Sequence, residues 1–293
     1  RAYPEAMTAL PLIRTFNDAY GIEITFYEWP VADAKAVVQI AHGLGEHARR
    51  YDHVAAALNR AGFAVYADDH RGHGVTGANQ KARGEIKNQG NLGKGGMAAT
   101  IGQVHKLTEL IRQENPSLPI FLIGHSWGSM LAQRIIRSHA SEYAGVILSG
   151  STLMLPGVVP SAGFNKKWDK LPDSTGKEWL SRDREVGIKF NADPLIFPET
   201  AIDVFGFLGV TKLLGVPSKK LPSHLPVMLI AGSEDPLGGE RGNKLLMNAF
   251  RRAGVQDVTL IIYPEARHEV FNELNKDEVI ADVVEWLNTS LSR

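Results

Sequence analysis

The feature that most constrains the fold of this chain is a short segment that joins a predicted strand to a predicted helix. The sequence Gly-His-Ser-Trp-Gly at 124–128 follows an apolar run at 120–123, which is typical of a buried parallel strand, and precedes apolar residues at helical spacing. A chain that passes from strand to helix so quickly needs small residues two positions before and after the central one. We therefore predict that Ser126 lies on a strained corner, with its hydroxyl above the edge of a sheet.

Predicted strands and helices alternate along most of the chain. The strand at 22–29 alternates apolar and polar residues, as an antiparallel strand near a sheet edge does, whereas the later strands are almost continuously apolar. The other predicted strands are 37–41, 63–66, 120–123, 144–149, 227–231 and 258–263. The predicted helices are 52–58, 95–114, the one that follows Ser126, 241–252 and 277–290. This order predicts an α/β fold with a mostly parallel, doubly wound sheet that helices cover on both faces.

The interval between the strands at 144–149 and 227–231 is about 70 residues long, which is too long for a plain crossover. It contains many large apolar residues mixed with lysines. We predict that residues 152–222 form an inserted helical cap, and that 1–151 and 223–293 form the core domain. The apolar residues of the cap either attach it to the core or line an acyl pocket, and the sequence leaves both alternatives open.

Composition limits the kinds of partner and nucleophile. The chain has 293 residues, of which 44% are hydrophobic, enough for one or two domains with a large core. Lys plus Arg and Asp plus Glu number 32 each, so no net charge favours nucleic acid or an anionic membrane surface. We expect a small-molecule partner. The absence of cysteine excludes a thiolate nucleophile and leaves serine chemistry as the natural choice.

The sequence contains neither a visible signal peptide nor an apolar stretch long enough to span a bilayer. We expect a cytoplasmic protein without stable membrane insertion, although the cap is able to contact lipid. The chain begins with Arg1 rather than Met, so we also expect that its natural start was trimmed or replaced. The sequence leaves the oligomeric state open.

Two further residues complete a candidate catalytic set. A serine hydroxyl becomes a good nucleophile only when a base removes its proton, and the base needs a carboxylate to orient it. Asp235 and His268 each follow a predicted strand, and the carboxyl ends of parallel strands meet at one edge of a sheet. We predict a triad of Ser126, Asp235 and His268, in the chain order that this architecture uses. Glu234 remains an alternative to Asp235.

Two polar loops follow other predicted strands. The glycine-rich loop at 42–47 either offers a backbone N–H to an anion or is an ordinary turn between strand and helix. The loop at 68–74 contains two aspartates and two histidines, but no periodicity aligns them as metal ligands. We interpret the charged side chains of 68–74 as braces for a loop beside the site, and we expect neither a metal ion nor a cofactor.

Several motifs in a fixed order strengthen these predictions. They are His42-Gly43-Leu44-Gly45-Glu46-His47 with Arg50-Tyr51, Asp69-His70-Arg71-Gly72-His73-Gly74, Gly124-His125-Ser126-Trp127-Gly128, Asp193-Pro194-Leu195, Gly232-Ser233-Glu234-Asp235, and His268. With these motifs the chain resembles α/β-hydrolases of the monoacylglycerol lipase and lysophospholipase type over most of its length. The resemblance implies the α/β-hydrolase fold, the triad named above, and an oxyanion hole formed by the backbone N–H groups of Leu44 and Trp127.

The resemblance also implies substrate contacts, but two departures restrict them. In such lipases the positions of Glu46, Arg50 and His125 help to hold the glycerol end of the substrate, and the cap forms an apolar channel. The family usually has Met-Gly-Gly after the serine, where this chain has Trp-Gly-Ser at 127–129. We expect the indole to narrow or reshape the pocket. The cap matches only at 191–195, so acyl length and leaving group are not carried over.

The predicted function is that of a serine carboxylester hydrolase, which cleaves monoesters such as monoacylglycerols through an acyl-enzyme on Ser126. Other acyl chemistry in the same fold remains an alternative, namely hydrolysis of monoalkyl aromatic esters, lysophospholipids, thioesters or amides, or acyl transfer to an alcohol. A non-catalytic protein that binds small molecules in the same pocket is a third hypothesis.

Overall fold

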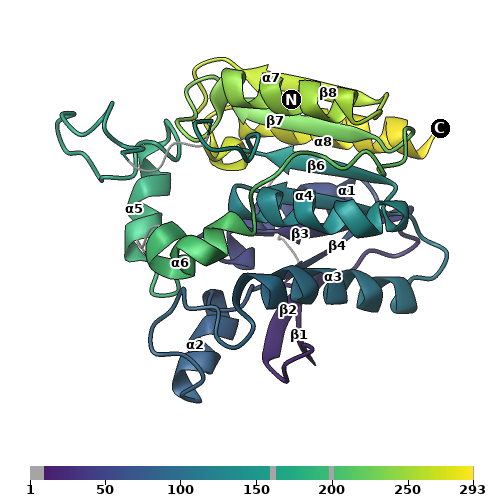
Figure 1. Cartoon of the computed structure of the whole chain (residues 1–293), viewed down its shortest axis with the longest axis horizontal. Coiled ribbons are helices and arrows are strands. Elements are labelled where there is room, and N and C mark those ends of the chain that lie inside the picture. Colours follow the sequence, from purple (N-terminus) through teal and green to yellow (C-terminus); the bar gives the residue numbers. More distant parts are fainter. Residues whose placement is uncertain (1–9, 159–162, 198–200, 293) are drawn as a thin grey trace.

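An eight-stranded sheet forms the centre of the protein (Figure 1). The computed structural model describes residues 10–158, 163–197 and 201–292. The strands are β1 (Leu12–Asn17), β2 (Glu23–Trp29), β3 (Ala36–Ala41), β4 (Phe63–Asp68), β5 (Ile120–His125), β6 (Gly145–Ser149), β7 (Val227–Gly232) and β8 (Val258–Tyr263). Their order across the sheet is β1-β2-β4-β3-β5-β6-β7-β8.

The sheet is parallel except at one side. β1 pairs antiparallel with β2, and β2 pairs antiparallel with β4, whereas all pairs from β4 to β8 are parallel. Every residue of β3, β4, β5, β6 and β7 is buried, as expected for parallel strands that are covered on both faces. The register places Gly124 beside both Ala41 and Leu148. The loops that follow β3, β5 and β6 therefore leave the sheet at the same edge.

Helices cover both faces of the sheet (Figure 1). One core cluster contains residues of α3 (Gly96–Glu114), α4 (Trp127–His139) and α7 (Gly239–Arg252). The cluster on the other face contains residues of α1 (Asp52–Arg60) and α8 (Lys276–Leu291). This covering of both faces of a mostly parallel sheet confirms the predicted α/β fold.

Two elements were not predicted, because neither has a regular apolar pattern. β1 has exposed apolar residues at its outer end, and it extends the sheet beyond the predicted strand at 22–29. α2 (Gly74–Ala82) buries mainly small and polar residues, and a Cβ atom on Gly77 would lie 2.3 Å from the carbonyl carbon of Gly72. Three short 3₁₀ helices complete the description: η1 (Ala48–Tyr51), η2 (Ala140–Glu142) and η3 (Val270–Asn272).

The segment between β6 and β7 contains α5 (Arg184–Ala192) and α6 (Ala201–Thr211), which lie beyond the edge where the strands end (Figure 1). Its backbone contacts two core loops: the Phe197 N–H donates to the Gly45 carbonyl at 3.2 Å, and the His268 N–H donates to the Trp179 carbonyl at 3.2 Å. The predicted cap at 152–222 includes 159–162 and 198–200, which lie outside the described residues, as do 1–9 of the predicted core. The domain boundaries stay a prediction.

Among the described residues, no helix combines the length and the apolar character that crossing a bilayer requires.

Candidate active site

Ser126 occupies the corner between β5 and α4, with a backbone conformation of φ 50° and ψ −120°. Positive φ values are unfavourable for a residue with a Cβ atom, so the predicted strain is confirmed. The flanking glycines explain how the corner closes. A Cβ atom on Gly124 would lie 2.5 Å from the Gly128 carbonyl oxygen, and one on Gly128 would lie 2.1 Å from the Ala41 carbonyl oxygen. The corner leaves Ser126 partly exposed, while its neighbours His125 and Trp127 are buried.

Asp235 and His268 contact each other in the loops that follow β7 and β8. His268 Nδ1 lies 2.9 Å from Asp235 Oδ1, and both side chains are almost fully buried. Burial alone would lower the pKa of His268, but the negative charge of Asp235 outweighs it and raises the pKa above its ordinary value of 6.5. The alternative carboxylate, Glu234, pairs instead with Lys167. Asp235 is thus the carboxylate that orients the His268 ring.

His125 contacts both the glycine-rich loop beside Ser126 and the ring of His268. A Cβ atom on Gly43 would lie 3.2 Å from Ser126 Cβ and 3.3 Å from His125 Cδ2, and the His125 ring centroid is 4.9 Å from that of His268. Among the described residues, the Ser126 hydroxyl forms no hydrogen bond with the His268 ring. Catalytic hydrogen bonds commonly form or shorten only when substrate binds. The structure thus brings the three predicted residues to one edge of the sheet and joins two of them directly.

The loop at 42–47 packs against the Ser126 corner. Its Gly43 N–H donates to Glu46 Oε1 at 2.6 Å, so the turn is closed on itself. On the other side of Ser126, Trp127 is the first residue of α4, and N–H groups in the first turn of a helix have no acceptor within the helix. These N–H groups at a helix N-terminus attract negative charge. The two backbone segments that contain the predicted oxyanion donors, Leu44 and Trp127, therefore flank Ser126.

Comparison with known proteins connects this geometry to a family. The family described as "Serine aminopeptidase, S33" matches residues 32–275. The monoacylglycerol lipase of Mycolicibacterium smegmatis is 30% identical over 289 residues, which cover 94% of this chain and 97% of that protein. The chain belongs to this serine hydrolase family.

Other similarities agree with that assignment. The monoglyceride lipase of Homo sapiens is 30% identical over 274 residues, which cover 89% of this hydrolase and 85% of the human protein. The structure of a thermostable carboxyl esterase from Bacillus coagulans, in complex with glycerol, superposes with a TM-score of 0.83 and 26% identity, covering 97% of this chain and 100% of that one. The predictions of an α/β-hydrolase, of a serine hydrolase and of ester hydrolysis are confirmed.

Glu46 and Arg50, which the family resemblance assigns to the substrate, are bonded to each other in the hydrolase. Arg50 Nη1 lies 2.5 Å from Glu46 Oε2, and its two terminal nitrogens lie 2.7 and 2.6 Å from the carboxylate oxygens of Glu269. Burial would raise the pKa of Glu269, but Arg50 outweighs it and lowers the pKa to about 2. Tyr51 also donates to Glu46, at 2.8 Å. This buried network joins the loop after β3 to the loop that carries His268.

Glu269 was not singled out from the sequence. The only signal for it was its position next to His268, since its partner Arg50 lies far away in the chain.

His125 is a neutral group in this setting. Burial, and then the charge of the neighbouring His268, lower the pKa of His125 to about 3. Its Nδ1 lies 3.2 Å from the Ser149 hydroxyl. Because its ring also contacts Gly43 and His268, His125 fills the space between the glycine-rich loop and the predicted base.

A second group of histidines consists of His42, the first residue of the glycine-rich loop, with His70 and His73 packed against it. His42 Nε2 accepts the His70 backbone N–H at 3.0 Å, which leaves the proton of the neutral ring on Nδ1. His42 Nδ1 lies 2.7 Å from the Gly43 carbonyl oxygen, and that carbonyl shares a peptide group with the Leu44 N–H. Burial and the nearby His70 lower the pKa of His42 well below its ordinary value, so the ring stays neutral. His42 thereby fixes the peptide plane whose N–H is a predicted oxyanion donor.

The loop at 68–74 has the bracing role that the sequence suggested. Asp69 accepts hydrogen bonds from the Ala48 and Val75 backbone N–H groups, at 2.9 and 2.7 Å, and from the Tyr27 hydroxyl at 3.0 Å. Asp68 accepts from the His70 ring at 2.7 Å and from the Gln103 side chain. These carboxylates therefore hold loops of the protein together.

The Trp127 indole forms part of an aromatic wall between α4 and the segment that precedes β7. Its ring lies 4.8 Å from the His73 ring and 4.8 Å from the Phe205 ring, measured between centroids. Phe197 contacts the other side of His73, at 4.7 Å. The Trp179 ring packs against the His268 ring, with 4.9 Å between their centroids. Aromatic side chains from the predicted cap therefore contact His268 and Trp127, the residue that follows Ser126.

Proposed function

We propose that this hydrolase cleaves carboxylic monoesters, monoacylglycerols among them, through an acyl-enzyme on Ser126. The observation that carries the proposal is the hydrogen bond between Asp235 and His268 at the sheet edge where Ser126 occupies its strained corner. The names of the relatives support the substrate class, since they include monoacylglycerol and monoglyceride lipases.

In the proposed mechanism, His268 accepts the proton of the Ser126 hydroxyl while the oxygen attacks the ester carbonyl. Asp235 stabilises the charged imidazole, in agreement with its effect on the pKa of His268. The Leu44 and Trp127 N–H groups hold the tetrahedral oxyanion, and each such donor contributes roughly 3–4 kcal/mol in comparable sites. His268 then protonates the leaving alcohol. In the second half, His268 activates a water molecule that releases the acid and restores Ser126.

Glu46, Arg50 and His125 differ in whether their polar groups are free to contact a substrate. Both carboxylate oxygens of Glu46 already accept hydrogen bonds, and Arg50 is bonded to two carboxylates. We therefore propose that Glu46 and Arg50 act mainly by holding the glycine-rich loop, and that His125 is the member of the three that can contact a glycerol group. Direct contacts of Glu46 and Arg50 with substrate remain a prediction.

The family description favours a second candidate, the removal of an N-terminal residue from a peptide. An aminopeptidase needs a carboxylate to bind the α-ammonium group of its substrate. The carboxylates near His268, Glu46 and Glu269, both already form ion pairs with Arg50, so neither is free to pair with an ammonium group. The geometry therefore favours a neutral ester over a charged peptide. A non-catalytic binding protein is disfavoured, because such a protein would not need the Asp235–His268 pair.

The test combines active-site labelling with a substrate panel. We expect a fluorophosphonate to modify Ser126, detected by peptide mass spectrometry, and we expect kcat/KM to be highest for monoacylglycerols and short p-nitrophenyl esters. The panel includes lysophospholipids, monoalkyl aromatic esters, thioesters and aminoacyl amides. Failure to label Ser126 would overturn the catalytic proposal, while labelling together with a preference for aminoacyl amides would replace the ester substrate by a peptide.

We also propose that the enzyme acts in the cytoplasm on a small ester, with residues 152–222 able to touch a lipid surface. Co-sedimentation with phosphatidylcholine vesicles, with and without a monoacylglycerol, tests the lipid contact. Equal recovery of the protein in the supernatant under both conditions would contradict it.

A further inference from the structure

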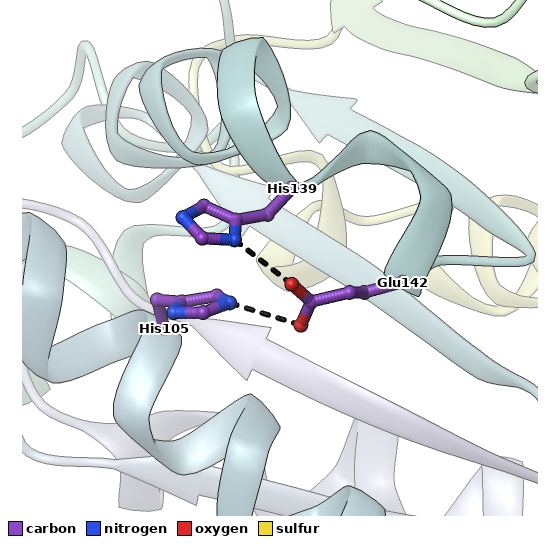
Figure 2. Close-up of side chains that lie close together, drawn as sticks. All are labelled: His105, His139 and Glu142. Carbon is purple, nitrogen blue, oxygen red and sulfur yellow. Dashed lines mark hydrogen bonds and ion pairs between the residues drawn. The ribbon is translucent and has the colours of Figure 1, made fainter.

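Three side chains far from the proposed catalytic residues converge on one point of the surface (Figure 2). His105 lies on α3, His139 is the last residue of α4, and Glu142 is the last residue of η2. His105 Nε2 lies 2.9 Å from Glu142 Oε2, and His139 Nδ1 lies 2.8 Å from Glu142 Oε1. The two imidazole rings face each other, with their centroids 3.6 Å apart. We call these three residues the α3–α4 cluster.

We propose that the α3–α4 cluster binds a divalent transition-metal ion of the Zn²⁺ type. Two imidazoles and one carboxylate form a ligand set that Zn²⁺, Ni²⁺ and Cu²⁺ accept. One ligand atom from each of the three residues lies within 4.8 Å of the other two. Tetrahedral zinc at its usual bond lengths needs its ligands roughly 3.3 Å apart. Small side-chain rotations close that difference.

The exposure of the cluster suits an ion that enters from solution. The side chain of His105 is 12% exposed, while those of His139 and Glu142 are 39% and 36% exposed. The two more exposed residues are free to adjust, and the less exposed one anchors the site on α3. With three protein ligands, a water molecule completes the tetrahedron from the solvent side.

The surroundings of the cluster also favour a cation. His139 ends α4, and the carboxyl end of a helix carries a partial negative charge. Glu109 Oε1 lies 3.8 Å from His105 Nδ1, the ring nitrogen that does not contact Glu142. Carboxylates in this position typically orient histidines that bind a metal.

Two neighbouring basic residues, Lys106 and Arg112, contact other groups. Lys106 pairs with Glu109 at 2.9 Å. Arg112 donates to the backbone carbonyls of Leu118 and Glu142, at 2.7 and 3.2 Å. Among the described residues, neither cation forms a hydrogen bond or ion pair with the carboxylate of Glu142.

Metal binding requires only a movement of protons within the two rings. In the metal-free arrangement, each ring nitrogen that contacts Glu142 carries a proton and donates a hydrogen bond to the carboxylate. A metal ion needs the lone pairs of the same nitrogens. The proton of His105 therefore moves to Nδ1, where Glu109 lies, and the proton of His139 moves to Nε2, which points away from Glu142 (Figure 2).

The ion would join α3 to the carboxyl end of α4, whereas Ser126 lies at the amino end of α4. The 13 residues of α4 separate the two ends by about 20 Å. The proposed ion thus takes no part in ester hydrolysis and acts on the stability of the fold. This site was not predicted from the sequence, because His105, His139 and Glu142 form no recognised spacing.

Metal titration of the chelator-treated, full-length protein tests the proposal. We expect Co²⁺ to produce visible d–d absorption bands that saturate at one ion per chain, and Zn²⁺ to displace it. At a Zn²⁺ concentration of about 100 times Kd, we expect Tm to rise by about 4–8 °C. The proposal would be overturned if metal, added up to millimolar concentration, produced no change in absorption and no shift in Tm.

Variants locate the bound ion. His105→Gln, His139→Gln and Glu142→Gln each keep a hydrogen-bonding side chain of similar size but lose a metal ligand, and we expect each to bind one equivalent less of Co²⁺ than the wild type. His224→Gln, which replaces an exposed histidine outside the cluster, is the matched control and should bind as the wild type does. Unchanged stoichiometry in all three cluster variants would show that the ion binds elsewhere. Far-UV circular dichroism and ester hydrolysis verify that each variant is folded.

Discussion

The two ends of helix α4 carry two polar clusters that are built in different ways. At the amino end, backbone strain at Ser126, glycine contacts and stacked aromatic rings hold the groups in place. At the carboxyl end, side-chain hydrogen bonds to Glu142 and the contact between the two imidazole rings hold the histidines. The amino end is therefore preorganised before any ligand arrives, as catalysis requires, whereas the carboxyl end is able to adjust around a ligand.

The two ends of α4 also differ in which groups have shifted pKa values. Near Ser126, burial lowers the pKa of His42, His73 and His125, so these rings stay neutral. His268 differs from these three histidines. Its pKa is raised, because the negative charge of Asp235 outweighs the effect of burial. At the other end of α4, the group with the shifted pKa is a carboxylate: two histidines lower the pKa of Glu142. Asp235, with Glu269 and Glu46 contributing in the same direction, thus sets His268 apart as the candidate base.

The largest effect should come from the preorganised end. Replacing Ser126 by alanine removes the nucleophile, and we expect kcat for a p-nitrophenyl ester to fall by on the order of a millionfold. The alanine variant should fold, because the small side chain is compatible with the corner. Turnover close to that of the wild type, with correct folding by circular dichroism, would remove Ser126 from the mechanism.

Loss of the carboxylate should come next. In Asp235→Asn we expect kcat/KM to fall by roughly 10⁴-fold, because the histidine loses the group that orients it and stabilises its charge. His268 must be unprotonated to act as a base, and its raised pKa places the acidic limb of the wild-type profile above pH 6.5. Removing the negative charge lowers that pKa, so the limb should move to lower pH.

The control for this prediction is the adjacent carboxylate. Glu234 pairs with Lys167 on the surface, and Glu234→Gln should leave kcat/KM and the acidic limb within about twofold of the wild type. A larger loss in Glu234→Gln than in Asp235→Asn would reverse the assignment.

The buried Arg50 network should dominate stability. Arg50→Met leaves Glu46 and Glu269 without their cation, and we expect the free energy of unfolding in urea to fall by about 3–5 kcal/mol at pH 7. Arg49→Met is the matched control, because Arg49 pairs with a partly exposed Asp52, and it should cost at most about 1 kcal/mol. Equal losses would contradict the structural role of the network.

The buried Arg50 network should also make the free energy of unfolding depend on pH. The folded pKa of Glu269 is about 2, below its ordinary value of 4.5, so the stability that it contributes is present above pH 4.5 and is lost as pH falls toward 2. The difference between wild type and Arg50→Met should therefore shrink over this interval. A constant difference between pH 5 and pH 2 would contradict the linkage.

The sequence predicted the amino end of α4 well because local rules determine it. An apolar strand, two glycines and a helix are sufficient to predict the corner at Ser126, and strand order is sufficient to bring Asp235 and His268 to the same edge. It could not predict Glu269 as a partner of Arg50, because that contact depends on how two distant loops pack. It also missed α2, whose buried residues are small or polar and give no periodic signal. The α3–α4 cluster was missed for a similar reason, since its members come from three separate elements.

A smaller effect is expected for the aromatic wall beside Ser126. The Trp127 indole fills space between His73 and Phe205, so Trp127→Met should open room for a longer acyl chain. We expect the ratio of kcat/KM for p-nitrophenyl decanoate to that for the butyrate to rise about tenfold, because added methylenes in an apolar pocket have effects of this size. Phe16→Leu, far from the site in β1, is a control for general loosening of the fold. An equal change of this ratio in both variants would show that Trp127 does not determine the preference for acyl-chain length.

The smallest effect should come from the carboxyl end of α4 without metal. Glu142→Gln removes the charge from two hydrogen bonds that are partly exposed to water, and such contacts contribute at most about 1 kcal/mol each after screening. In the presence of a chelator, we therefore expect the free energy of unfolding to change by less than about 2 kcal/mol, well below the effect of Arg50→Met. Addition of Zn²⁺ should widen the gap between wild type and Glu142→Gln, because only the wild type keeps all three ligands. Wild type and Glu142→Gln could instead already differ, in the presence of a chelator, by as much as wild type and Arg50→Met do. The α3–α4 cluster would then stabilise the fold without metal, as the network around Arg50 does, and the contrast between the two ends of α4 would disappear.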